Sequence, residues 1–272
     1  MENIFKQLPI AFPFYESLDN QEIYKENVDE NLFYKLYTPQ NSLLPFQIRM
    51  PVNKPAPTAW KIIQYENPTV EIDITNKLNF IKLFVFSDYK QAVFFGDDLG
   101  INMPCGHYYT KIIFPDNTYY VSEVFFASSV ADCMRVEFWQ EKDVAPIIYR
   151  NNWKQILYLP TFVHTALPEI DEETTKDGFN NEIPIYQKMM LKYKFVDVVP
   201  DFLKIALVSL QMQDYVYLWI SETRKGFIDR IWVSATPDET GMMNDVEVLF
   251  EDDLMIKTKC NNNDTLINLT NW

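Results

Sequence analysis

The chain has 272 residues, of which 47% are hydrophobic and 15% aromatic, with 16 Tyr and 20 Phe. This is enough apolar material for a packed core, and the aromatic excess favours β-structure because such side chains suit pleated, half-buried surfaces. A formal net charge of −14 argues against specific nucleic-acid binding and against anionic membranes. With 6 Gly against 16 Pro, a glycine-rich nucleotide-binding fold is also disfavoured.

Residues 1–58 are irregular, with short aromatic pieces separated by polar segments and by four prolines, Pro45, Pro51, Pro55 and Pro57. Proline interrupts helices and removes a hydrogen-bond donor from strands. We therefore expect an extended N-terminal arm that lies on a neighbouring subunit, or else an edge strand packed on its own domain. The sequence shows neither a signal peptide nor an apolar run of the roughly 18 residues that a membrane helix needs.

Closely spaced strands follow and predict a β-sandwich over residues 59–150. A hairpin is expected where Pro115-Asp116-Asn117-Thr118 separates two apolar runs, because these residues favour turns. A later strand places Val136 and Phe138 on one face. The predicted strands are 60–65, 70–74, 80–86, 92–95, 111–114, 119–126 and 133–138.

Residues 151–272 predict a second unit, a split β-barrel-like domain with one packed helix. Pro200-Asp201 opens a helix over 201–213, with Asp201 as N-cap or Pro200 as first helical residue. An apolar stripe at helical spacing is expected to pack on the sheet, and it consists of Leu203, Ala206, Leu207 and Leu210. The predicted strands are 156–159, 186–195, 215–220, 227–234 and 245–250, after which residues 251–272 lose the pattern.

An acidic segment, residues 167–184, precedes the longest predicted strand. It has few apolar groups to offset its ordering entropy, so we expect an extended loop or hairpin ordered by contact with neighbouring subunits. Long loops of this kind are usually functional. The candidate assembly residues are Glu169, Asp171, Glu172, Glu173, Asp177, Gly178 and Phe179.

Residues that could carry chemistry are sparse. His107 and His164 lie in no zinc-protease motif, no nucleophile elbow is present, and Cys105, Cys133 and Cys260 form no CxxC pair. The acidic loop and Asp97-Asp98 lack the spacing of an EF-hand calcium loop. We expect no catalytic residue, no metal and no cofactor, and therefore a protein that is not an enzyme.

Aromatic side chains allow a second hypothesis, because ring faces can stack on sugars. The candidates are Trp60, Tyr65, Trp139, Trp153, Trp219 and Trp232. The alternative function is therefore a carbohydrate-binding β-sandwich module.

Two stretches resemble a known group of proteins. Residues 174–184 leading into 186–195, then the helix, 226–233 and 246–250, resemble the ring-forming domain shared by tailed-bacteriophage tail-tube, distal-tail and baseplate-hub proteins. Residues 106–112 and 116–125 are similar to β-sandwich modules in tail proteins of phages that infect Bacteroidetes. Distal-tail proteins also pair these two parts, with the ring domain first, whereas here the sandwich precedes it.

The resemblance implies a structural virion protein, made in the bacterial host cytoplasm and located in the phage tail. In that family a polar loop feeds a long strand, one helix packs on a split barrel, and subunit sheets join into a ring. The implied partners are further copies of the chain in a homo-oligomeric ring and neighbouring tail-tube, hub or baseplate proteins. No specific nucleic acid and no membrane is expected.

Overall fold

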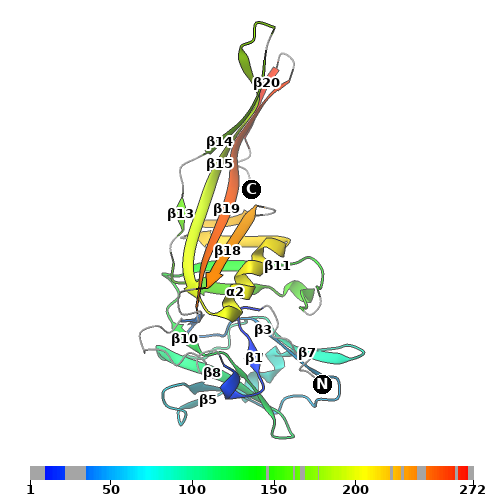
Figure 1. Cartoon of the computed structure of the whole chain (residues 1–272). Coiled ribbons are helices and arrows are strands. Elements are labelled where there is room, and N and C mark those ends of the chain that lie inside the picture. The colour runs from blue at the N-terminus through cyan, green and yellow to red at the C-terminus, as the bar shows by residue number, and fades with distance from the viewer. Residues whose placement is uncertain are drawn as a thin grey trace.

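The computed structural model describes residues 10–21, 35–144, 147–161, 163–165, 169–176, 178–220, 223–227, 230–237, 243–260 and 263–268. Within these ranges the strands form four sheets. Figure 1 shows a broad lower body, a middle part that holds the helix α2, and a narrow β-ribbon that projects away from both. The prediction of a mainly β fold is confirmed.

The lower body is a sandwich of a seven-stranded and a three-stranded sheet. Between them, the rings of Phe46, Trp60 and Phe94 have centroids 5.3–6.0 Å apart, and all three side chains are fully buried. The larger sheet contains β1 (Phe14–Tyr15), β2 (Tyr37–Pro39), β4 (Ala59–Gln64), β5 (Glu71–Asp73), β8 (Gly106–Ile113), β9 (Tyr119–Ser122) and β10 (Phe125–Ser128). The smaller contains β3 (Phe46–Pro51), β6 (Lys82–Val85) and β7 (Tyr89–Phe94).

The hairpin predicted around Pro115 is present as β8 and β9. Asn117 has a φ of 61°, a conformation that asparagine tolerates in turns, and Asp116 accepts a hydrogen bond from the Thr118 backbone at 3.1 Å. The predicted strand 119–126 is divided between β9 and β10, which pair with different segments of β8. Short 3-10 helices connect other strands: η1 (Leu18–Asn20), η2 (Thr75–Phe80) and η3 (Arg150–Asn152).

Two further sheets curl around the helix. The four-stranded sheet runs in the order β12-β11-β16-β17, with β11 (Met134–Trp139), β12 (Gln155–Leu159), β16 (Tyr215–Ile220) and β17 (Thr223–Phe227). The six-stranded sheet contains β13 (His164–Thr165), β14 (Glu169–Lys176), β15 (Glu182–Val199), β18 (Ile231–Pro237), β19 (Asn244–Cys260) and β20 (Asn263–Asn268). Because β11 pairs with β12 and β16, the predicted domain boundary at 150/151 is wrong.

The helix α2 (Asp201–Val208) continues as the 3-10 helix η4 (Ser209–Met212). Pro200 is its N-cap and Asp201 its first residue, so both predicted assignments of these positions were off by one. The predicted stripe is confirmed, since Leu203, Ala206, Leu207 and Leu210 are all 0% exposed.

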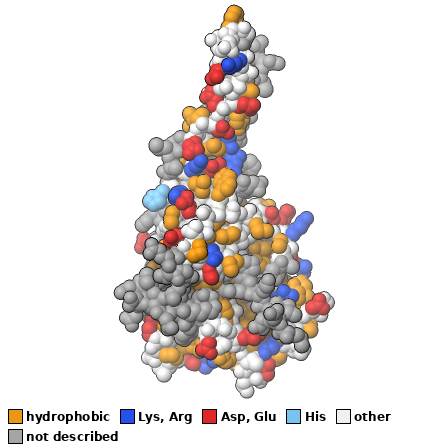
Figure 2. All heavy atoms as spheres, in the orientation of Figure 1, with side chains coloured by type: hydrophobic (Ala, Val, Ile, Leu, Met, Phe, Trp, Pro, Cys, Tyr) orange, Lys and Arg blue, Asp and Glu red, His pale blue; other side chains and the backbone are white. Residues whose placement is uncertain are grey.

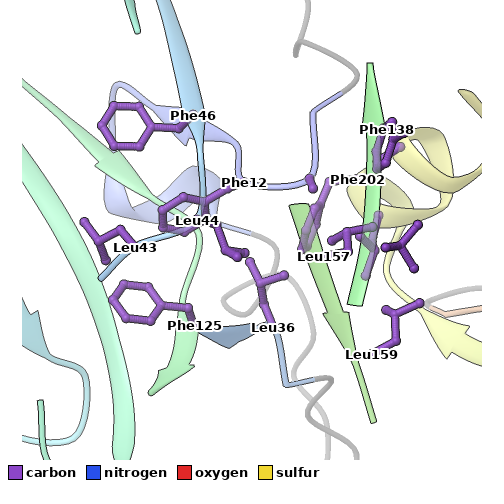
Figure 3. Packing of buried hydrophobic residues seen from close by; sticks show 14 of the residues in the cluster. Phe12, Leu36, Leu43, Leu44, Phe46, Phe125, Phe138, Leu157, Leu159 and Phe202 are labelled. Atoms are coloured by element: carbon purple, nitrogen blue, oxygen red, sulfur yellow. The ribbon is translucent and has the colours of Figure 1, made fainter. Parts of the chain in front are cut away.

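The prediction of a separate arm over 1–58 is wrong for the described residues, and the alternative of an edge strand packed on its own domain is confirmed, because β1 and β2 end the strand order of the seven-stranded sheet. Ile10, Ala11 and Phe12 are buried, β1 pairs with β9, and β2 runs parallel to β10. Figure 3 shows why: Phe12 and Leu36 lie between the sandwich residues Phe46 and Phe125 on one side and Leu157 on the other. The N-terminal segment therefore fills the junction between the two parts, and residues 59–150 are not a sandwich on their own.

The projecting ribbon is made of four antiparallel strands in the order β14-β15-β19-β20. Strand β15 has 18 residues and β19 has 17, so both extend from the buried core into the ribbon (Figure 1). The expectation that regular structure is lost after residue 250 is wrong, because β19 continues to Cys260 and β20 pairs with it.

Candidate functional site

The predicted assembly segment forms the β14–β15 hairpin of the ribbon. Glu169, Asp171, Glu172 and Glu173 lie on β14, where all eight residues are exposed. Gly178 and Phe179 lie in the connecting turn, and Asp177 lies outside the described residues. The structure thus places six of the seven predicted residues on one exposed edge of the molecule.

Two apolar side chains stand out on this hairpin. Phe179 is 89% exposed and Ile170 is 68% exposed. Single exposed apolar residues are common, but these two occur on an element that projects from the body and has no core of its own. Such side chains are suited to burial against another protein surface.

The turn and the irregular pairing shape the tip of the hairpin. Asn180 has a φ of 66°, and the register of β14 shifts between Glu173 and Thr174. Pro184, which has no N–H to donate, lies opposite Thr174 at this shift. Such a bulge bends a strand and increases its twist, so the tip is set apart from the regular ribbon below it.

Charge on the hairpin is only partly compensated. Lys192 Nζ lies 2.6 Å from Glu169 Oε2 and 3.5 Å from Glu251 Oε1, and the hydrogen bond to Glu169 raises the pKa of Lys192. Gln187 donates to Glu172 at 3.1 Å. Asp171 and Glu173 have no ion-pair partner among the described residues, which leaves an acidic edge.

A second open edge lies at the base of the same sheet. Within the described ranges, β18 pairs with β19 alone and has no charged residue. Its Trp232 is 47% exposed, and Val196 and Val198 on the same outer face are 47% and 44% exposed. Exposed edge strands are usually protected by charges, prolines or bulges. Here the only such residue is Pro237 at the very end of β18.

The histidines and cysteines are dispersed. His107 Nδ1 lies 2.6 Å from Glu66 Oε1, whereas His164 is exposed on β13 opposite Lys194. Cys105 and Cys133 are free thiols. In the part of the chain that the structure describes, no three His, Cys, Asp or Glu side chains form a group that could hold a metal ion.

The aromatic candidates for sugar stacking divide into three groups. Trp60 and Trp153 are fully buried. Trp139 and Trp219 lie on the outer face of the four-stranded sheet, where neighbouring side chains cover their rings. Trp232 is on the outer face of the six-stranded sheet, and Tyr65 follows β4 in the sandwich. The structure therefore brings no continuous platform of open ring faces together from these residues.

One partly buried carboxylate was not anticipated from the sequence. Asp197 lies on the inner face of β15 between Phe195 and Val199; its Oδ1 accepts from the Val198 backbone at 2.9 Å. Its Oδ2 is buried without a hydrogen-bond partner among the described residues. Burial raises the pKa of Asp197 to about 6.

Asp197→Asn is therefore expected to make the protein about 2 kcal/mol more stable at pH 8 and equally stable at pH 4, after allowance for partial exposure. The folded state holds this proton more tightly than the unfolded chain, so stability falls as pH rises through about 4 to 6. Urea unfolding at both pH values measures this. Asp88→Asn, at an exposed position between β6 and β7, is the control, and an equal gain for Asp197→Asn at both pH values contradicts the assignment.

Comparison of the chain with protein-family models and with curated proteins finds no match in either case. None of the helices in the described ranges has the length and apolar character needed to cross a membrane.

Proposed function

We propose that the chain is a structural protein of a tailed-bacteriophage virion, a ring-forming subunit of the tail or baseplate of the distal-tail or hub-like kind. The observation that carries the proposal is the projecting four-stranded ribbon, whose outer strand β14 is exposed at every residue. A projecting ribbon with an exposed outer strand gains stability most simply from contact with another subunit.

Other features support the same proposal. A helix packs against two curled sheets, and the long strand β15 follows the acidic strand β14. In addition, β18 has an uncharged edge that is unpaired within the described ranges, and its Trp232 is exposed. Unprotected edges favour pairing with a further chain, and repeated pairing around an axis closes a ring. The proposed partners are copies of this chain and neighbouring tail-tube, hub or baseplate proteins, with the virion tail as its location.

Deleting residues 171–180 is expected to leave a folded protomer that no longer assembles. The described residues of this segment are exposed, so their loss removes no core contact. Sedimentation velocity and negative-stain imaging measure assembly, and thermal unfolding checks the fold.

A narrower pair of variants serves as the matched control. Ile170→Ala with Phe179→Ala is expected to weaken assembly, whereas Leu83→Ala with Val85→Ala, exposed on β6 at 40% and 69%, is not. Normal assembly of the deletion variant contradicts a role for the hairpin. A monomer of the native chain that binds glycans points instead to the carbohydrate-binding alternative.

A further inference from the structure

The outer face of the four-stranded sheet carries a compact group of cations and aromatic rings. We call it the cation–aromatic face and define it by Arg135, Trp139, Lys154, Tyr217, Trp219 and Arg224. Cross-strand pairing places Arg135, Trp219 and Arg224 in one row across β11, β16 and β17. The face is thus built on rigid strands.

The rings on this face are packed side by side. Trp139 stacks on both Tyr215 and Tyr217, with centroids 5.2 Å apart in each pair and interplanar angles of 19° and 13°. Arg224 lies 3.8 Å from the centroid of Tyr217 and 5.8 Å from that of Trp219. The cation–aromatic face therefore combines stacked, half-exposed rings with the exposed side chain of Arg224.

Gly226 makes this packing possible. Tyr217 lies directly opposite Gly226, and a Cβ at Gly226 would come within 2.8 Å of Tyr217 Cε1. The tyrosine ring therefore lies over the glycine backbone, where Arg224 covers it.

A buried carboxylate holds the cations in place. Glu137 is 1% exposed, forms an ion pair with Arg135 at 2.5 Å, and accepts from Lys154 at 2.5 Å and from the Trp219 indole at 3.2 Å. Two cations thus share one carboxylate, and Arg224 has no carboxylate partner among the described residues. The face keeps a positive excess on a chain whose net charge is −14.

We propose that the cation–aromatic face binds the acidic edge strand β14 of a second copy of the chain. The side chains on this face are half-exposed, and Trp, Tyr and Arg are the residue types that dominate binding energy at protein interfaces. This inference rests on the proposed function, since it identifies one contact of the self-assembly.

Strand β14 complements the face in charge and in size. Asp171 and Glu173 point to one side of the strand and have no ion-pair partner among the described residues, whereas Ile170, 68% exposed, points to the other side. Five residues of a strand span about 13 Å, close to the roughly 14 Å across four strands. The ribbon projects away from the body, and Figure 2 shows acidic side chains along its exposed surface. When two copies meet, the ribbon of one copy can reach the cation–aromatic face of the other. The ribbon then does not have to bend back onto its own body.

The contact joins two different surfaces of the same chain, so it is heterologous and generates a ring or a filament. It is also electrostatic, so salt is expected to weaken it. Arg224→Glu, and Asp171→Lys combined with Glu173→Lys, are each expected to weaken self-association about tenfold or more. Mixing the two variants is expected to restore association, because each then offers the charge that the other has lost.

Sedimentation velocity of the full chain at low and high salt measures these effects, with Lys82→Glu on β6 as the control for a charge change elsewhere. Association that survives both variants, or that mixing does not restore, overturns the inference while the ring proposal stands. A charge-dependent filament that never closes into rings supports the contact and contradicts the ring. A native chain that stays monomeric at all concentrations overturns both.

Discussion

Leu207→Asp is expected to unfold the upper part of the molecule. Leu207 is fully buried in the cluster that joins α2 to the two curled sheets. A carboxylate there has no cation to pair with inside the cluster, and burying such a charge costs about 4 kcal/mol or more. Because small proteins are stable by only about 5–15 kcal/mol, most of the stability is lost. Circular dichroism and urea unfolding measure the effect.

Ile205→Asp is the matched control on the same helix. Ile205 is 44% exposed, so an aspartate there stays in water and is expected to change stability by less than about 1 kcal/mol. If Leu207→Asp is as stable as Ile205→Asp, the helix does not pack as described. Since the stripe was identified from spacing alone, this pair tests the sequence pattern together with the structure.

Glu137→Ala is expected to lower stability by about 3 kcal/mol. The substitution removes two hydrogen bonds, from Lys154 and the Trp219 indole, and the ion pair with Arg135, and it leaves the two cations without their shared carboxylate. Both cations are 34% exposed, so water offsets part of the loss. Urea unfolding at neutral pH measures the change.

Glu141→Ala provides the comparison, because Glu141 is exposed two residues beyond β11. Its loss is expected to cost less than about 0.5 kcal/mol. A loss for Glu137→Ala no larger than this would show that the buried carboxylate is not what holds the two cations.

Local patterns predicted local structure well. The alternation in 215–220 and the spacing of Leu203, Ala206, Leu207 and Leu210 gave correct elements, because one buried face repeats with the period of the strand or helix. The acidic segment forms a hairpin, one of the two forms expected for it, whereas its expected contact with neighbouring subunits stays a prediction.

Long-range pairing was not predictable in the same way. Strand β11 joins β16, about eighty positions later in the chain, and the Ala11 backbone donates to Gln155 at 2.9 Å. Nothing in either local pattern specifies these partners. For this reason the domain boundary and the N-terminal arm were wrong.

The ribbon and the cation–aromatic face are two further features that the sequence pattern did not predict. Beyond Phe250, Glu251-Asp252-Asp253 interrupts the alternation, yet β19 continues to Cys260 because its backbone pairs with β15 and β20. In the sequence, Glu137 is a single carboxylate between the apolar residues Val136 and Phe138 of strand β11. Its donors, Lys154 and Trp219, come from outside that strand, so no local spacing indicates the network.

The continuity of β15 and β19 between core and ribbon has a consequence for strand alignment. A pair of strands with no face buried in a core is prone to slippage by one residue, because no side chain is then forced to one face. At their core ends, however, Phe195 pairs with Val248 and both are fully buried. A slip there would turn these side chains to water. The buried ends therefore fix the alignment of β15 and β19 as far as the irregularity between Met189 and Met190, and the pairing beyond it starts from that fixed point before any partner binds.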